Sequence, residues 1–188
     1  MGDATGKGVP AALVMSTTLG MLRLAAQSYF SPGQILQRVN EALFANIPSN
    51  MFVTCFYAVL DPESASLTYA NAGHDLPYLH HHEGEAKELR ARGMPLGLMS
   101  SMGYEEMELV LEGGEGVLFY SDGLVEAHNP EGEMFGFPRL RELVSKHGAE
   151  EESLEEALLE ELYSFVGEGW EQEDDITLVT LRHAAARY

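Results

Sequence analysis

Cysteine, tryptophan and basic residues are scarce in this sequence. Its 188 residues include one cysteine, one tryptophan and only 11 Lys and Arg, against 30 Asp and Glu. The single cysteine, Cys55, excludes an internal disulfide, and its place in the apolar run MFVTCFYAVL favours a buried structural thiol. No basic segment leading into an apolar run and a cleavage site opens the chain. Together these features predict a cytoplasmic protein.

The scarcity of positive charge narrows the classes of partner. The formal net charge is −19, so nucleic-acid phosphates and anionic lipid surfaces would be repelled. Divalent cations, in contrast, would be concentrated near such a surface. The segment 9–26 is apolar, but Ser16, Gly20 and Arg23 interrupt it, which favours a core helix over a membrane span. We therefore expect neither a nucleic-acid partner nor a membrane partner.

Length and composition fit one domain. The chain is 45% hydrophobic and 22% charged, values typical of a globular protein with a proper core. The sequence shows no internal repeat and no low-complexity linker. It therefore predicts a single domain that spans residues 1–188.

Helical and strand-like segments come in blocks. Ser31 and Pro32 are typical of an N-cap and a first helical residue. The helical spacing that follows predicts a buried face made of Ile35, Leu36, Val39, Leu43 and Phe44. The expected helices cover 11–28, 32–47, 138–146 and 153–166, and the expected strands cover 51–60, 66–70, 76–79, 86–89, 107–111, 117–120 and 176–181.

The order of these segments predicts the fold class. Strands 107–111 and 117–120 are expected to pair with each other across Gly113 and Gly114. Helices and strands do not alternate as βαβ units do. The sequence therefore predicts an α+β fold with a mostly antiparallel sheet.

Three aspartates stand at the ends of apolar, strand-like runs. Asp3 lies in GDATGKG, Asp122 follows GVLFY in GVLFYSDG, and Asp174 opens DDITLV. Such carboxylates, with no Cys or His at matching places, suit Mg²⁺ or Mn²⁺ and not zinc. The adjacent Asp174 and Asp175 repel each other unless a cation lies near them. Each segment alone is also typical of a solvated turn, but together they predict a metal site that serves a phosphate-bearing substrate.

The glycine-rich start differs from a nucleotide-binding loop. GDATGKG is one residue short of the GxxxxGK spacing, and Gly8 stands where Ser or Thr would bind magnesium. This argues against nucleotide binding. Gly6 and Gly8 instead allow a sharp bend between Asp3 and a helix that begins near Pro10.

Six stretches carry a family resemblance. GDATGKGVPAALVM, FVTCFYAVLD, LTYANAGHDLPYL, GMPLGL, VLFYSDGLVEA and DDITLV occur in this order and span nearly the whole chain. In them the sequence resembles the metal-dependent (PPM-type) serine/threonine protein phosphatases, in the bacterial branch typified by SpoIIE and RsbU. The resemblance implies two antiparallel β-sheets packed as a sandwich, with helical layers outside (α-β-β-α).

The resemblance also implies the site and its chemistry. Two Mn²⁺ or Mg²⁺ ions would be held by Asp3, the carbonyl of Ala4, Asp122 and Asp174. Asp3 would bridge both ions, and Asp175 would orient a ligand or water from outside. A water activated by the two ions would attack the phosphorus of a phosphoserine or phosphothreonine. The implied substrate is a STAS-type anti-sigma-factor antagonist.

The chain departs from the family's pattern at its start. Family members carry about one more strand pair before the GDATGKG stretch, so the resemblance implies that the family's first strands, and the strand presenting Asp3, are lacking. We expect weak metal binding and low activity of this chain alone. The alternative is an inactive phosphatase-like module that binds a partner or transmits a signal. The sheet edge left exposed would favour a homodimer.

Histidines offer weaker signals. His80, His81 and His82 are expected at an exposed hairpin end, where adjacent side chains point to opposite faces and do not form a metal site. His74, in NAGH, belongs to the family pattern. Its residues leave open whether it acts as an acid or holds a turn.

Overall fold

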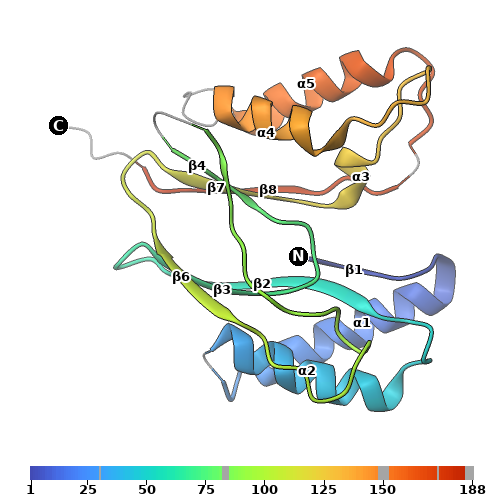
Figure 1. Cartoon of the computed structure of the whole chain (residues 1–188), viewed down its shortest axis with the longest axis vertical. Helices are drawn as coiled ribbons and strands as arrows, with labels where there is room; N and C mark the ends of the chain where they lie inside the picture. The colour runs from blue at the N-terminus through green and yellow to red at the C-terminus, as the bar shows by residue number, and fades with distance from the viewer. Residues whose placement is uncertain (30, 82–84, 148–152, 173, 185–188) are drawn as a thin grey trace. The chain divides into compact units, whose positions relative to one another are not determined.

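The computed structural model describes residues 1–188 except 30, 82–84, 148–152, 173 and 185–188 (Figure 1). Contacts divide the chain into two compact units. The first unit comprises Met1–His74 and Arg90–Val110, and the second comprises Asp75–Leu89 and Leu111–Tyr188. Each unit contains one antiparallel sheet, so the predicted α+β class is confirmed. The prediction of a single domain stays a prediction.

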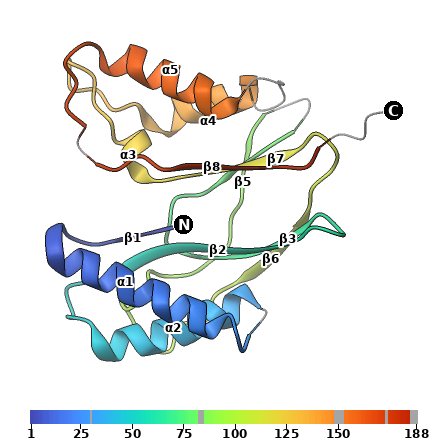
Figure 2. The ribbon, with the colours of Figure 1, turned by 180° about the vertical axis from the view of Figure 1, so that it is seen from behind.

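The first unit places two helices against a four-stranded sheet. The strand order is β1-β2-β3-β6, and all neighbours are antiparallel. Figure 2 shows α1 and α2 side by side below this sheet. The elements are β1 (Gly2–Ala4), α1 (Gly8–Ala25), α2 (Pro32–Asn46), β2 (Val53–Asp61), β3 (Ser66–Ala72) and β6 (Glu106–Val110).

The core of the first unit lies between sheet and helices. Val53, Cys55 and Ala70 of the sheet meet Leu36 and other residues of the helices. Cys55 is only 3% exposed, and burial raises the pKa of its thiol to about 11. The prediction of a structural thiol is therefore confirmed.

The second unit repeats this architecture with other elements. Its strand order is β5-β4-β7-β8, again antiparallel throughout, and α4 and α5 cover one face (Figure 1). The elements are β4 (Tyr78–His80), β5 (Lys87–Glu88), β7 (Gly116–Tyr120), α3 (Asp122–Val125), α4 (Gly136–His147), α5 (Leu154–Val166) and β8 (Leu178–Arg182). The β4–β5 hairpin was predicted, and its expected tip at Glu83 and Gly84 lies outside the described residues.

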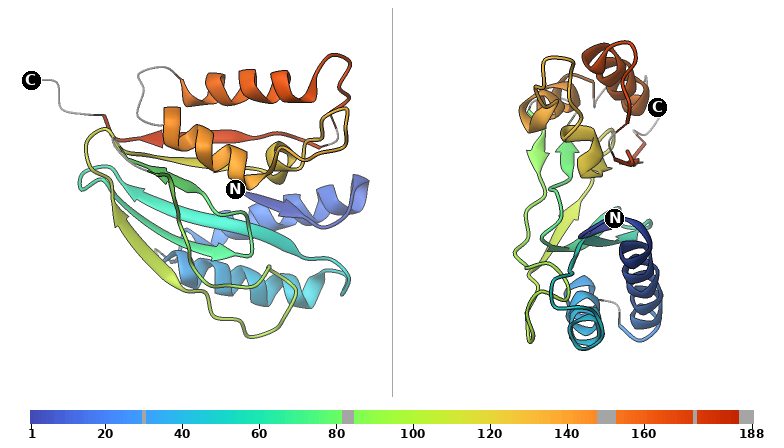
Figure 3. Two further views of the ribbon diagram at one scale, coloured as in Figure 1. Left: turned by 45° about the horizontal axis from the view of Figure 1, so that its top comes forward. Right: turned by 90° about the vertical axis from the view of Figure 1, so that its right-hand side faces the viewer.

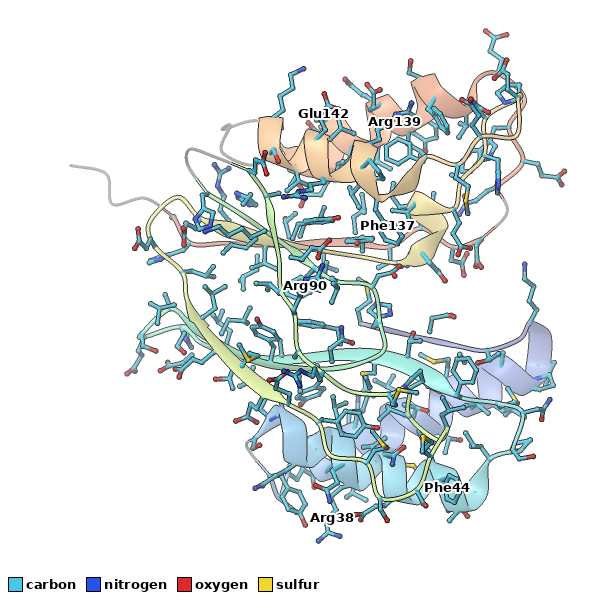
Figure 4. All side chains as sticks on the ribbon, viewed as in Figure 1. Arg38, Phe44, Arg90, Phe137, Arg139 and Glu142 are labelled. Atoms are coloured by element: carbon cyan, nitrogen blue, oxygen red, sulfur yellow. The ribbon has the colours of Figure 1, made fainter. Side chains whose placement is uncertain are left out.

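Aromatic and capping contacts fix the helices of the second unit. Ser153 accepts a hydrogen bond from the backbone nitrogen of Glu156 (3.3 Å), as an N-cap does. The guanidinium of Arg139, labelled in Figure 4, lies 4.1 Å from the ring centroid of Phe165. Such a cation–π contact ties α4 to α5. The predicted helix end at Gly148 lies outside the described residues.

The predicted pairing of strands 107–111 and 117–120 is wrong. β6 pairs with β3 in the first unit, whereas β7 lies between β4 and β8 in the second. The run GVLFY of β7 is almost wholly buried, as a central strand requires, while EMELV of β6 is mostly exposed and suits an edge. A hairpin would have given the buried strand a charged neighbour.

The prediction that no strand presents Asp3 is also wrong. Gly2–Ala4 form β1, and Asp3 lies opposite Thr54 of β2. β1 lies at the edge of its sheet (Figure 3). The expected weak metal binding of this chain stays a prediction.

Phe44 departs from the predicted buried face of α2. Its side chain, labelled in Figure 4, is 47% exposed, while the neighbouring Leu43 is fully buried. One residue turns the side chain by about 100° around a helix, which carries Phe44 past the edge of the buried stripe.

Helix α1 is buried along one narrow stripe. Ala11, Val14 and Thr18 are its buried residues, whereas Leu13 and Leu24 are 63% and 68% exposed. The expectation of a core helix thus holds for one face. By length and composition α1 is apolar enough to cross a membrane, with a mean hydropathy of 1.3, but core helices of soluble proteins meet the same criterion.

Candidate functional site

Asp3 lies on a short edge strand of the first unit. Because successive residues of a strand point to opposite faces, Ala4 is buried in the core while Asp3 is exposed. After β1 the chain bends at Gly6 and Gly8, with φ angles of 96° and 74°, and enters α1. The predicted role of these two glycines is confirmed.

Thr5 and Thr54 hold β1 on its partner strand. The backbone nitrogen and the hydroxyl of Thr5 each donate to the carbonyl of Phe52, both at 3.0 Å. The hydroxyl of Thr54 donates to the carbonyl of Asp3 at 3.4 Å. Polar side chains therefore supplement the few ladder bonds that a three-residue strand can make.

Asp122 begins the short helix α3, directly after the buried strand β7. Ser121 fixes this turn to the chain before β8. Its backbone nitrogen donates to the carbonyl of Thr177 (3.0 Å), and its hydroxyl donates to the carbonyl of Asp175 (2.9 Å). The backbone nitrogen of Thr177 in turn donates to the Ser121 hydroxyl (2.9 Å). The strand end is thus bonded to the predicted acidic segment.

Gly123 brings the two acidic segments of the second unit together. A Cβ at this position would lie 2.6 Å from the carbonyl oxygen of Asp175 and 3.4 Å from the carbonyl carbon of Asp174. Only a residue without a side chain permits so close a backbone approach. The sequence SDG therefore sets Asp122 beside the Asp174–Asp175 segment.

The exposed carboxylate of Asp174 is oriented by the backbone of the next residue. Its Oδ1 accepts a hydrogen bond from the backbone nitrogen of Asp175 (2.8 Å), and its carbonyl accepts one from Gln172 Nε2 (2.8 Å). Asp175 is exposed as well. Its predicted role outside the ligand set stays a prediction.

Asp75 is a carboxylate that the sequence reasoning missed. It is half-buried and follows the NAGH turn. Burial, with the negative charges of Asp122 and Glu126, raises its pKa to about 6. The signal in the sequence was its place after a strand, which Asp122 shares. A carboxylate so destabilised by its neighbours fits the chemistry of a divalent cation.

The predicted ligands come from both units. Asp3 and Ala4 belong to the first, while Asp122 and Asp174 belong to the second. Within the described part of either unit, no three His, Cys, Asp or Glu side chains form a group ready to hold a metal ion. The convergence of the four residues on one ion pair stays a prediction.

The histidine run is not exposed as expected. His80 is 3% exposed, and burial lowers its pKa to about 4. The neighbouring His81 is half-buried and contacts the carboxylate of Glu115 through its Nδ1. His80 pairs with Gly116 of the central strand β7 and His81 contacts Glu115, and the hairpin's own sequence shows neither of these distant neighbours. His82 lies outside the described residues.

Comparisons with known proteins identify relatives of this chain. Phosphoserine phosphatase RsbU of Bacillus subtilis (strain 168) is 29% identical over 183 residues, which cover 96% of this chain and 53% of that protein. The chain therefore spans about half the length of this curated relative.

Two solved structures resemble the chain closely. The SiaA-PP2C domain of Pseudomonas aeruginosa superposes with a TM-score of 0.78 at 26% identity, covering 96% of this chain and 72% of that one. The RsbU and RsbW domains of Rv1364c from Mycobacterium tuberculosis give a TM-score of 0.78 at 26% identity, covering 100% of this chain and 51% of that one. These likenesses confirm the predicted fold class.

The match to a family covers almost the whole sequence. The family described as Stage II sporulation protein E (SpoIIE) matches residues 1–184 of the 188. This match agrees with the order of motifs from GDATGKG to DDITLV. The chain therefore belongs to the SpoIIE family.

Proposed function

We propose that this chain is a protein serine/threonine phosphatase that hydrolyses phosphoserine or phosphothreonine on a protein substrate. The observation that carries the proposal is the contact at Gly123, which sets Asp122 beside the Asp174 segment. Membership of the SpoIIE family and the likeness to RsbU, a phosphoserine phosphatase, support the reaction class.

Asp3, Asp122, Asp174 and the carbonyl of Ala4 would hold two Mn²⁺ or Mg²⁺ ions. Their oxygen donors are those that hard cations prefer. When bound, such an ion pair supplies positive charge to the phosphate and lowers the pKa of a water. This charge is needed because the protein itself carries −19.

The chain's own residues would bind and orient the reactants. Asp3 would hold the ions from β1, while the Ser121 hydroxyl fixes the turn that carries Asp122. Burial and the negative charges of Asp122 and Glu126 raise the pKa of Asp75 to about 6, and cations that neutralise those charges would favour its ionised form. The carboxylates thus form an acidic site that accepts a phosphate only together with metal.

For the substrate we propose a STAS-type anti-sigma-factor antagonist. The relative that joins RsbU and RsbW domains in one chain supports a place in a sigma-factor regulatory pathway. We further propose a cytoplasmic location and a homodimer through the open edge of β1, since an unpaired strand edge favours pairing with another chain.

The reaction is tested with a phosphoserine-bearing STAS protein and Mn²⁺. Phosphate release that needs Mn²⁺ and disappears in Asp122→Asn would support the proposal. An absence of release from any phosphoprotein, in a folded chain with Mn²⁺ bound, would contradict it and would favour the binding module.

A further inference from the structure

Asp3, Thr54 and His74 share one face of the first unit's sheet. Directly opposed residues of an antiparallel pair point to the same side, and Asp3 lies opposite Thr54. His74 follows β3 with its Nδ1 3.1 Å from Thr54 Oγ1. The other side of the sheet carries Ala4 and the helices. Thr54 therefore connects the predicted bridging ligand to His74.

The Thr54 hydroxyl lies between two partners. It donates to the carbonyl of Asp3 at 3.4 Å, so the hydrogen bond with His74 needs a donor on the imidazole. This arrangement places the ring hydrogen on Nδ1 and leaves Nε2 as the bare acceptor. His74 therefore donates a hydrogen bond to the Thr54 hydroxyl, which in turn donates one to the Asp3 carbonyl.

His74 is held in one orientation. Its backbone nitrogen donates to Asn71 Oδ1 (2.8 Å), and Asn71 Nδ2 donates to its carbonyl (2.9 Å). His74 is 8% exposed, and burial lowers its pKa to about 4, so the ring is neutral at pH 7. Its Nε2 is buried and has no hydrogen-bond partner among the described residues.

A role in the turn alone leaves the imidazole unexplained. The two hydrogen bonds with Asn71 use only the backbone of His74, so they would form with other residues at this position. Among the described residues, the ring makes one hydrogen bond, to Thr54. Since β1 has three residues and lies at a sheet edge, a single side-chain contact matters more there than in a longer strand.

We propose that His74 is a positioning residue, which fixes the Asp3 backbone through the Thr54 hydroxyl and so directs the Asp3 carboxylate toward a divalent cation. The inference rests on the proposed function. Partners behind metal ligands typically change metal affinity by about 10- to 100-fold when removed. Because the bond to Asp3 is long, an effect of about tenfold is expected.

The test compares removal with conservative replacement. Thr54→Val and His74→Leu remove the polar contact, whereas Thr54→Ser keeps a hydroxyl and His74→Asn keeps a donor near Nδ1. Thr68→Val, in β3 of the same sheet, is the matched control. Calorimetry gives the Mn²⁺ affinity, and amide hydrogen exchange in EDTA gives the protection of Gly2–Ala4 relative to β3.

We expect Thr54→Val and His74→Leu each to lower the Mn²⁺ affinity by about tenfold. Both variants should also exchange faster in β1, and the double variant should be no weaker than either single one. Thr54→Ser and His74→Asn should keep most of the Mn²⁺ affinity and most of the exchange protection of β1. The inference is overturned if the removal variants match Thr68→Val, or if the conservative variants lose as much as the removal variants.

A wild-type chain that binds no Mn²⁺ would refute the proposed function. Exchange in EDTA would still decide the positioning role, because it needs no metal. Normal Mn²⁺ binding with unchanged exchange in both removal variants would refute the positioning role and leave the proposed function standing.

Discussion

The two units hold their predicted ligands by different means. In the first, Asp3 lies on a three-residue edge strand that hydroxyls of Thr5 and Thr54 help to hold. In the second, Asp122 and the Asp174 segment meet backbone against backbone at Gly123, with Ser121 bonded across. The first unit depends on side-chain hydrogen bonds, whereas the second adds to the bonds of Ser121 a backbone contact that only glycine allows.

This difference predicts how each half fails. Loss of one hydrogen bond lowers the free energy of unfolding by about 1 kcal/mol and leaves the fold intact. An added methyl group in a backbone contact forces the chain apart and costs more. Substitutions around Asp3 in the first unit should therefore cause small, graded losses of stability. A side chain at Gly123 in the second unit should disrupt the contact between the two acidic segments.

The largest effect is expected from the carboxylates themselves. Asp3→Asn in the first unit and Asp122→Asn in the second should each lower phosphate release by at least about 100-fold, because charge that stabilises the reaction is lost. Melting curves should change little, since Asp3 is exposed and Asp122 half-buried. Glu63→Gln, an exposed turn carboxylate, is the control. Loss in only one of the two variants would contradict a shared site.

Gly123→Ala should lower the free energy of unfolding by about 1–3 kcal/mol, because the new Cβ would lie 2.6 Å from the Asp175 carbonyl oxygen. The matched control is Gly20→Ala on α1, where a Cβ meets no atom within 4 Å. That change should stabilise the protein by about 0.5–1 kcal/mol. Denaturant unfolding measures the stability of both variants. Equal changes in Gly123→Ala and Gly20→Ala would show that the backbone contact at Gly123 does not require glycine.

Asp75 and His74 should give opposite pH dependences in EDTA. The pKa of Asp75 is raised to about 6, so the folded state keeps its proton longer and its contribution to stability falls as pH rises from about 4 to 6. The pKa of His74 is lowered to about 4, so its contribution is present above about 6.5 and is lost as pH falls toward 4.

Replacing each residue should remove its own slope. Asp75→Asn should raise stability at pH 7 by about 1–2 kcal/mol, and His74→Asn should flatten the loss between pH 6.5 and 4. Unfolding free energies measured from pH 4 to 7.5 check both. Parallel curves for the wild type and both variants would show that neither group titrates as described.

The smallest effects are expected from single hydroxyls. Ser121→Ala removes both side-chain hydrogen bonds of Ser121 and should cost about 1–2 kcal/mol of unfolding free energy. Thr5→Val removes one bond, to the Phe52 carbonyl, and should cost about 0.5–1 kcal/mol. A larger loss of unfolding free energy in Thr5→Val than in Ser121→Ala would contradict the expectation that the second unit is the more sensitive of the two.

The sequence predicted the elements better than their partners. Periodicity and caps are local, so α2 and α5 began where Ser31 and Ser153 indicated. The pairing of β6 and β7 depends on which sheet each strand joins, and the intervening glycines looked like a hairpin turn.

The site was predicted in the same uneven way. The resemblance named Asp122 and Asp174 as ligands, and the close backbone contact at Gly123 agrees with this, while their shared metal site stays a prediction. Asp75 was missed because its raised pKa arises from burial and from the charges of Asp122 and Glu126, and none of these is visible in the local sequence. The contact of His74 with Thr54 likewise joins β2 to the turn after β3, and no local sequence pattern predicts it.

The central proposal is that Asp3, Asp122 and Asp174 hold the same pair of ions. Calorimetric Mn²⁺ titration of the wild type, Asp3→Asn, Asp174→Asn and the double variant tests it most directly. A bridging Asp3 predicts two ions in the wild type, loss of both in Asp3→Asn, and a double variant no worse than Asp3→Asn alone. Independent losses that add up in the double variant would contradict a shared pair of ions.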